Sequence, residues 1–423
     1  MTKDEVHEAV NQMGARARVA AHRLAQLSAA EKNAILHGMA GGLRAAAAEI
    51  LAANALDLDA GSAKGLAPAM LDRLRLDAGR IEAIARGLEQ VATLTDPVGD
   101  VMDSWQRPNG IRIEQVRVPI GVIGIIFESR PNVTSDASVL CLKSGNATIL
   151  RGGSEAIHSN RAIAAALQAG GGAAGLPEHA IQLVPFTDRE SVAALAGMDK
   201  YLDLIIPRGG KGLIETVVAL ARMPVIKHYD GICHVFLDAA ADEAMAVALT
   251  VDSKTQKPGV CNALETLLIH AQAAGRLLPA VAAALAAKNV ELRGDPRSLE
   301  ILGDAAVPAC EDDWRAEYLD LILAIKVVDS LDEAVAHINE YGSHHTDVIV
   351  TGDEVAAERF LREVDSACVF HNVSTRFADG EEFGFGAEIG ISTDKLHARG
   401  PMALRELTSY QYRVRGAGQT KGH

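Results

Sequence analysis

Hydrophobic residues in the first quarter of the chain recur with the period of an α-helix. Ile81, Ile84 and Leu88, for example, fall on one helical face. This pattern predicts that residues 5–95 are helical and that they serve as scaffold.

The pattern changes to that of strands after residue 97. Residues 111–118 alternate between apolar and polar side chains, which predicts an exposed, two-faced strand. Residues 121–127 are continuously apolar, as is typical of a strand buried on both faces. Strands and helices then alternate as far as Arg222, which predicts a parallel sheet covered by helices, with ligands beyond the carboxyl ends of its strands. A second alternation begins near Lys227 and predicts a second α/β domain.

One more half-polar strand is predicted at residues 405–415, near the end of the chain. Like residues 111–118, it stands apart from the alternation of strands and helices. Two such strands are able to pair although they lie far apart in the sequence, and to add to a sheet of another subunit. We therefore expect a homo-oligomer.

Composition and charge narrow the classes of function. The 423 residues suggest two or three domains, and a net charge of −14 argues against nucleic acid, whose phosphates require a basic face. The five cysteines are widely spaced without a C-x-x-C pair, which fits a reducing cytosol and argues against a zinc site. The N-terminus lacks a signal-peptide pattern, and the longest apolar run, residues 277–287, is too short to span a bilayer. We expect a cytoplasmic protein that does not enter a membrane.

Cys261 is the candidate nucleophile. It ends a polar segment, residues 253–263, that glycine and proline interrupt, and Lys254 and Lys257 precede it by seven and four positions. A thiol attacks as the thiolate, which nearby cations favour. The alternative is that Cys261 is a small buried hydrophobic residue, as most intracellular cysteines are.

Two basic, glycine-rich turns connect a predicted strand to a helix. They are Arg151–Ser154 and Arg208–Gly212. Glycine lets the backbone approach a phosphate, and the N-terminus of a helix attracts anions. Tight turns also favour glycine without any ligand, but two such turns in one sheet indicate a nucleotide with several phosphates.

Two further polar segments are candidates for ligand contacts. Residues 128–136 follow the buried strand and open a helix, a position that suits a ligand; the alternative is that Asn132 or Thr134 caps the helix. Residues 338–347 place two adjacent histidines between a helix and a strand. Because no third ligand at a fixed spacing is evident, we expect a hydrogen-bonded loop or a substrate contact and no metal site.

Several short motifs are specific when they are taken together. They are Glu128–Thr134, Lys257–Ala263, the segment from Val335 through Ile349, Glu388–Thr393 and Lys395–Pro401. In this order they resemble the aldehyde dehydrogenase superfamily along nearly the whole chain, and most closely its γ-glutamyl phosphate reductase branch. The resemblance implies an aldehyde dehydrogenase-like α/β fold with two doubly wound domains and a β-arm for oligomerisation. The regions expected are an NADP-binding domain at 1–226 with arm strands at about 100–118, a catalytic domain at 227–380, and a return to the cofactor domain and the arm at 381–423.

The resemblance also implies roles for individual residues. Cys261 would be the nucleophile, and Asn132 with the backbone N–H of Cys261 would form the oxyanion hole. Glu317 would contact the nicotinamide ribose of NADP(H), the cofactor that this branch prefers. The residues that lie where the adenosine and phosphates of the cofactor would bind are Arg151, Gly209, Gly210 and Lys211.

One departure from the hydrolytic members of the superfamily bears on the reaction. Those enzymes activate water with a glutamate in a Glu-Leu-Gly-Gly motif, whereas the corresponding residues 225–232 contain no glutamate. A thioester on Cys261 should therefore meet hydride and not water. The resemblance implies NADPH-dependent reduction of γ-glutamyl phosphate to glutamate 5-semialdehyde and phosphate in proline biosynthesis. The substrate contacts expected from charge and position are Lys254 and Lys257 for the phosphate, and Arg130, Ser343, His345 and Arg399 for the α-carboxylate.

Two alternatives differ from this function. A CoA-acylating aldehyde dehydrogenase also dispenses with the water-activating glutamate. The second alternative is a homologue that has lost its catalytic activity and has a binding role. Such a protein would not need Cys261, Asn132 and both glycine-rich turns, all of which are present. Because the chain contains no kinase region, a separate glutamate 5-kinase must supply the acyl phosphate and is a possible partner.

Overall fold

The computed structural model describes residues 1–421, which form two compact units. Unit 1 comprises residues 1–227 and 385–390 together with the segment that begins at Met402. Unit 2 comprises residues 228–384 and 391–401. Within residues 1–421, no helix is both long enough and apolar enough to cross a membrane.

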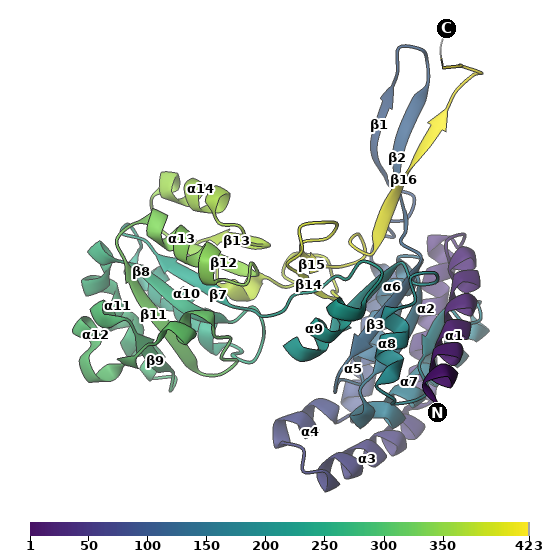
Figure 1. Ribbon diagram of the computed structural model, residues 1–423, viewed down its shortest axis with the longest axis horizontal. Coiled ribbons are helices and arrows are strands. Elements are labelled where there is room, and N and C mark those ends of the chain that lie inside the picture. The colour runs from purple at the N-terminus through teal and green to yellow at the C-terminus, as the bar shows by residue number, and fades with distance from the viewer. Residues whose placement is uncertain (422–423) are drawn as a thin grey trace. The chain divides into compact units, whose positions relative to one another are not determined.

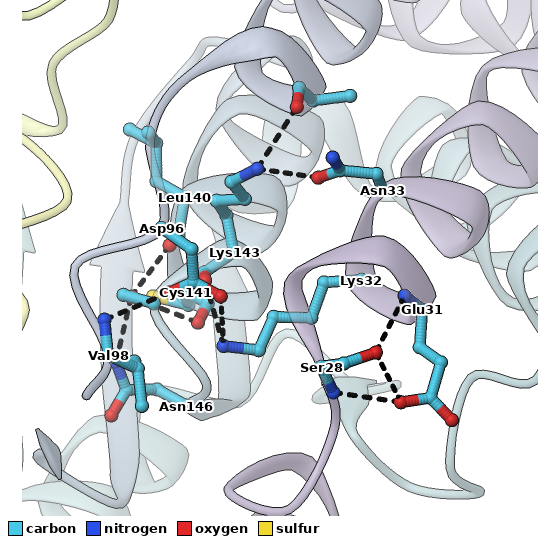
Figure 2. A network of polar contacts seen from close by, with 12 residues as sticks. Ser28, Glu31, Lys32, Asn33, Asp96, Val98, Leu140, Cys141, Lys143 and Asn146 are labelled. Carbon is cyan, nitrogen blue, oxygen red and sulfur yellow. Dashed lines mark hydrogen bonds and ion pairs between the residues drawn. The ribbon is translucent and has the colours of Figure 1, made fainter.

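Unit 1 begins with a helical region, as the sequence predicts. Its helices are α1 (Lys3–Leu24), α2 (Ala29–Ala45), α3 (Ala47–Ala63), α4 (Pro68–Leu74) and α5 (Ala78–Thr93). A capping box begins α2, because Ser28 accepts from the Glu31 N–H while the Glu31 carboxylate accepts from the Ser28 N–H. Behind this cap, the buried Lys32 ammonium binds Asp96 at 2.8 Å, which ties α2 to the segment that follows α5 (Figure 2).

A four-stranded parallel sheet forms the centre of unit 1, which confirms the first predicted alternation. Its order is β5-β4-β3-β6, and β3 is buried along its whole length. The strands are β3 (Val122–Phe127), β4 (Ala147–Gly152), β5 (Ile181–Leu183) and β6 (Leu204–Arg208), and the helices between and after them are α6 (Val133–Lys143), α7 (Ile157–Ala173), α8 (Glu190–Ala196) and α9 (Lys211–Leu220). Phe127 pairs with Gly152 on one side and with Arg208 on the other, so the carboxyl ends of three strands share one edge.

A separate three-stranded antiparallel sheet extends from unit 1 (Figure 1). It consists of β1 (Val101–Gln106), β2 (Arg112–Pro119) and β16 (Thr408–Arg415). Strand β16 pairs with β2 along its full length, from Thr408–Pro119 to Arg415–Arg112. The predicted pairing of two strands far apart in the sequence is therefore confirmed. The large exposed side chains of this three-stranded sheet include Trp105, Tyr410, Tyr412 and Val414.

Unit 2 is built on a seven-stranded sheet in the order β10-β9-β11-β8-β7-β12-β13, in which every pairing is parallel. The strands are β7 (Cys233–Leu237), β8 (Leu264–His270), β9 (Glu291–Gly294), β10 (Val307–Pro308), β11 (Ile322–Val328), β12 (Thr346–Val350) and β13 (Cys368–His371). The helices are α10 (Glu243–Thr255), α11 (Ala271–Ala286), α12 (Pro296–Leu302), α13 (Leu331–Tyr341) and α14 (Glu354–Glu363). A short pair, β14 (Gly390–Ser392) and β15 (Gly400–Met402), forms a two-stranded sheet.

The central strands of unit 2 send alternate side chains to its two faces, as strand geometry requires. Val235 of β7 packs in one core with residues of α11 such as Leu277. The next residue, Phe236, packs in the opposite core, where its ring stacks on Phe360 of α14 at a centroid distance of 6.5 Å. Burial on both faces explains why these strands are apolar throughout.

Candidate active site

Cys261 lies in the turn that leads directly into β8. Strands β7, β8 and β12 are parallel neighbours, so the residues before them gather at the amino-terminal edge of the sheet. The Cys233 thiol at the start of β7 donates to the carbonyl oxygen of Cys261 at 3.2 Å. The Ile232 N–H donates to the Ser343 hydroxyl at 2.8 Å. The structure therefore brings Cys261 and Ser343 to the same edge of unit 2.

Gly231 fixes the backbone next to Cys261. A Cβ at residue 231 would lie 1.9 Å from the Cys261 carbonyl oxygen, closer than atoms can approach. The Gly231 N–H donates to Glu317 Oε1 at 2.8 Å. Glu317, predicted to contact the nicotinamide ribose, is thus held beside the segment that touches Cys261. Sequence analysis missed Gly231, because nothing in its local pattern reveals a contact thirty residues away.

The two lysines predicted to hold the phosphate have different environments. Helix α10 runs through Thr255, into the segment expected to be a loop, and carries Lys254 in its last turn. The Lys254 side chain is fully buried and binds the equally buried Glu265 at 2.7 Å. This burial disfavours the predicted phosphate contact for Lys254. Lys257 is exposed, so a contact between Lys257 and the phosphate stays a prediction.

Burial acts in opposite directions on the partners of this pair. It lowers the pKa of Lys254 and raises the pKa of Glu265 to about 7, because both charged forms lose hydration. The charge of each partner opposes the shift of the other. The 2.7 Å contact therefore offsets part of the hydration that the two charged groups lose on burial.

His345 lies at the start of the β12 segment and is completely buried. Its Nδ1 is 2.8 Å from the Thr346 hydroxyl and 3.7 Å from the Cys233 sulfur. Burial, together with the neighbouring His228, lowers the pKa of His345 to about 3. The imidazole is consequently neutral near pH 7, so a contact with the substrate would be a hydrogen bond and not an ion pair.

Arg399 is partly buried and faces Asp365, in the segment before β13. Its guanidinium donates to the Asp365 carboxylate at 2.9 Å and to the carbonyl oxygen at 3.2 Å. Lys395 also binds Asp365, and hydrogen bonds from Lys395 and Arg399 lower the pKa of this carboxyl group. Arg399 Nε is buried and has no hydrogen-bond partner within residues 1–421, and the substrate contact of Arg399 stays a prediction.

The other candidate residues lie at the carboxyl-terminal edge of the unit 1 sheet. The Gly210 N–H at the start of α9 donates to Glu128 Oε2 at 2.9 Å. A Cβ at residue 209 would lie 2.5 Å from the same carboxylate oxygen, whereas one at residue 212 would meet no atom of residues 1–421 within 4 Å. Lys211 is exposed at this helix N-terminus. The Arg151 guanidinium, at the end of β4, donates to Ser191 and to the Thr187 carbonyl oxygen.

Asn132 stands at the N-cap position of α6 but does not cap the helix with its side chain. Its amide instead donates to Asp136 at 2.7 Å, and the Thr134 hydroxyl donates to Asn160. The alternative of side-chain capping is therefore wrong, and Asn132 has a second amide hydrogen for another acceptor. Burial raises the pKa of Asp136 to about 6. Arg130 is exposed in the same turn.

Known proteins resemble this chain over its full length. The model for the aldehyde dehydrogenase family matches residues 1–299. A γ-glutamyl phosphate reductase of Rhodospirillum rubrum is 54% identical over 421 residues, which cover 100% of this chain and 98% of that protein. The crystal structure of γ-glutamyl phosphate reductase from Thermotoga maritima matches with a TM-score of 0.96 at 45% identity, covering 98% of this chain and 100% of the other. This chain belongs to the aldehyde dehydrogenase family, in its γ-glutamyl phosphate reductase branch.

The family assignment confirms the resemblance and the aldehyde dehydrogenase-like α/β fold. An acetylating aldehyde dehydrogenase from Geobacillus thermoglucosidasius shares that fold, with a TM-score of 0.68 at 17% identity over 100% of this chain and 99% of the other. Aldehyde dehydrogenases are oxidoreductases that use nicotinamide cofactors. At the unit 1 edge, the start of α9 offers such a group open space at Gly212 and the exposed cation of Lys211, while the Gly210 N–H already donates to Glu128.

Proposed function

We propose that this chain reduces γ-glutamyl phosphate to glutamate 5-semialdehyde and phosphate, with NADPH, in proline biosynthesis. The observation that carries the proposal is the placement of Cys261 at the amino-terminal edge of unit 2, beside Gly231 and Glu317, in a full-length relative of γ-glutamyl phosphate reductases. The cytoplasm is the compartment we expect for this reaction.

In the proposed reaction, the Cys261 thiolate attacks the acyl carbon of the substrate. A C–S bond forms and the C–O bond to phosphate breaks, so that phosphate leaves with the electron pair. NADPH, when bound, supplies hydride to the carbonyl carbon of the thioester. The thiohemiacetal oxyanion then collapses: the C–S bond breaks, the sulfur keeps the bonding electron pair as thiolate, and the C=O bond of the aldehyde forms.

The residues of the chain have distinct tasks in this scheme. The Asn132 amide and the Cys261 N–H would stabilise the oxyanion, and preorganised donors of this kind are effective because they need no rearrangement. Lys257 would hold the departing phosphate, while Arg130, Ser343 and Arg399 are the candidates for the α-carboxylate. The complete burial of His345 disfavours such a contact, as it does for Lys254. Residues 225–232 supply no glutamate to activate water, so the thioester is preserved for hydride.

Arg151, Gly209, Gly210 and Lys211 would bind the adenosine and phosphates of the cofactor, and Glu317 would contact the nicotinamide ribose. Two basic residues at a carboxyl-terminal sheet edge suit NADP, whose adenosine carries an additional phosphate. The sheet formed by β1, β2 and β16 would serve oligomerisation, and its exposed Trp105, Tyr410 and Tyr412 support that role. A glutamate 5-kinase would supply the substrate.

Phosphate-dependent NADP reduction tests the function. Purified protein is given glutamate 5-semialdehyde with NADP or NAD, and with phosphate or CoA as the acyl acceptor. We expect NADPH formation that requires phosphate and that is lost in Cys261→Ala. Activity with CoA in place of phosphate would favour the acylating alternative. A Cys261→Ser variant that rescues a proline auxotroph as well as the wild type does would favour a binding role.

A further inference from the structure

The segment that carries Cys261 is held at both of its ends by one buried ion pair. Helix α10 ends at Thr255, one position after Lys254, and β8 begins at Leu264, one position before Glu265, so residues 256–263 lie between the two partners. Lys254 Nζ and Glu265 Oε2 are 2.7 Å apart, and both side chains have a relative exposure of 0%. The contact therefore closes the loop across its base.

The same glutamate also holds the segment that presents Glu317. Glu265 Oε1 accepts from the Leu319 N–H at 3.3 Å. Leu319 has φ = 53°, a left-handed conformation that is unfavourable for a branched side chain and needs support from its surroundings. Two residues earlier, Glu317 accepts the Gly231 N–H, and Gly231 packs against the Cys261 backbone. Glu265 is thus connected to Cys261 along two routes.

Stability alone is a poor explanation for this pair. Removing two charges from water costs about as much free energy as their attraction returns, so an apolar pair of similar volume is often as stable. An apolar pair, however, makes no directional hydrogen bonds. The Lys254–Glu265 and Glu265–Leu319 contacts join defined atoms and so fix the positions of two segments. The Asn262 side chain also holds the Cys261 loop, because it donates to the Ala378 carbonyl oxygen at 3.0 Å.

We propose that Lys254 and Glu265 are a positioning pair, which holds the Cys261 loop and the Glu317 segment in register for the reaction. Neither residue is proposed to touch the substrate. The inference rests on the proposed function, in which Cys261 is the nucleophile. It gives Lys254 a role that its burial allows, in place of the phosphate contact expected from the sequence.

The test replaces the pair by apolar residues of similar volume, in Lys254→Met/Glu265→Leu, and separately removes one charge, in Glu265→Gln. The control is Lys32→Met/Asp96→Leu, which removes a buried lysine–carboxylate pair of unit 1 whose side chains are 1% and 9% exposed (Figure 2). Two quantities are measured for each variant. One is hydrogen exchange in peptides covering residues 256–264 and 317–321, with α11 as the reference. The other is kcat and KM for glutamate 5-semialdehyde in the phosphate-dependent assay.

A positioning role predicts faster exchange in the two active-site peptides, with α11 unchanged. It also predicts a kcat lower by about 10- to 100-fold, since a displacement of ~1 Å in a reacting group has effects of this size, and a KM close to that of the wild type. The control variant should match the wild type in both measurements.

Two results overturn the inference. One is wild-type exchange and kcat in the double variant. The other is exchange that rises equally in α11, which would make the pair a general stabiliser of unit 2. A failure of the proposed function looks different, because the wild type itself would then lack phosphate-dependent activity while the exchange measurement still reports on the loop.

Discussion

The two parallel sheets of this protein place their candidate residues at opposite edges. In unit 1, Arg151 and the turn before α9 follow strands and lie at the carboxyl-terminal edge. In unit 2, Cys261 and Ser343 precede strands and lie at the amino-terminal edge. Helices that follow parallel strands begin at the first kind of edge, where their N-termini favour anions. At the amino-terminal edge the helices end, and their C-termini do not favour anions. An anionic substrate at that edge must therefore be bound by side chains.

This difference assigns separate tasks to the two edges. The edge of unit 1 suits the phosphates of a cofactor, which backbone N–H groups and glycine can approach. The edge of unit 2 suits a covalent reaction, because Gly231, Glu317 and Glu265 fix the nucleophile from several sides. Substitution of Cys261 should therefore leave the binding of the cofactor phosphates intact.

The largest effect is expected for Cys261→Ala. Without the nucleophile, kcat should fall by on the order of 10⁴-fold or more. NADPH binding, followed by its fluorescence, should keep the wild-type Kd, because the cofactor phosphates are assigned to unit 1. A variant that loses both activity and NADPH binding would contradict the separation of the two edges.

Gly231→Ala should have the next largest effect. Its Cβ would overlap the Cys261 carbonyl oxygen at 1.9 Å, so the loop must move and kcat should fall by about 100-fold. Gly275→Ala in α11 is the matched control, since its Cβ would meet no atom of another part of the described chain within 4 Å. Steady-state kinetics that show equal kcat values for the two variants would rule out the close packing as a determinant of catalysis.

Asn132→Ala tests the proposed role of Asn132 as a donor to the oxyanion. Loss of one oxyanion donor should lower kcat by ~100-fold. The KM for NADPH should stay near the wild-type value, because Asn132 is not among the residues assigned to the cofactor. Kinetics with both substrates varied provide the measurement, and a wild-type kcat would remove Asn132 from the oxyanion hole.

Lys257→Ala should have a smaller effect that is confined to phosphate. An exposed cation contributes modestly, so the KM for phosphate should rise by about 10-fold or less while the Kd of NADPH is unchanged. Raising the salt concentration should weaken phosphate binding in the wild type more than in the variant. Unchanged turnover together with an unchanged KM would refute the phosphate role.

The smallest effect concerns stability and pH at Asp136. Burial raises the pKa of this carboxyl group from 3.8 to about 6 in the folded chain. Between these values the unfolded chain binds fewer protons, so stability falls as the pH rises through this window. Asp136→Asn should flatten the profile and add about 1–2 kcal/mol near pH 7, after allowance for the partial exposure of the side chain. Chemical denaturation of the wild type and the variant at several pH values gives the free energy of unfolding. An equal slope of this free energy against pH in both proteins would contradict the prediction.

Periodicity in the sequence predicts most of the fold correctly. The buried β3, the parallel sheets and the pairing of β2 with β16 follow from alternation and continuous apolar runs. The stretch from β9 to β10 escaped prediction, because strands of four and two residues carry too little pattern.

The site was only partly predictable. Lys254 and Lys257 look alike in the sequence, and only the length of α10 decides that one is buried against Glu265 while the other is exposed. Gly231 and Glu265 act through contacts with residues that are distant in the chain, so the local sequence pattern does not indicate their roles. Capping by Asn132 was a reasonable alternative, which its bond to Asp136 excludes.

The central claim is that Cys261 carries an acyl group that is protected from water until phosphate or hydride arrives. Enzyme incubated with glutamate 5-semialdehyde and NADP, without phosphate, should accumulate this acyl group. Mass spectrometry of the peptide that contains Cys261 should then show a γ-glutamyl adduct, which disappears when phosphate is added. Sustained NADPH formation without phosphate, with free glutamate as the product and no adduct on Cys261, would contradict the account.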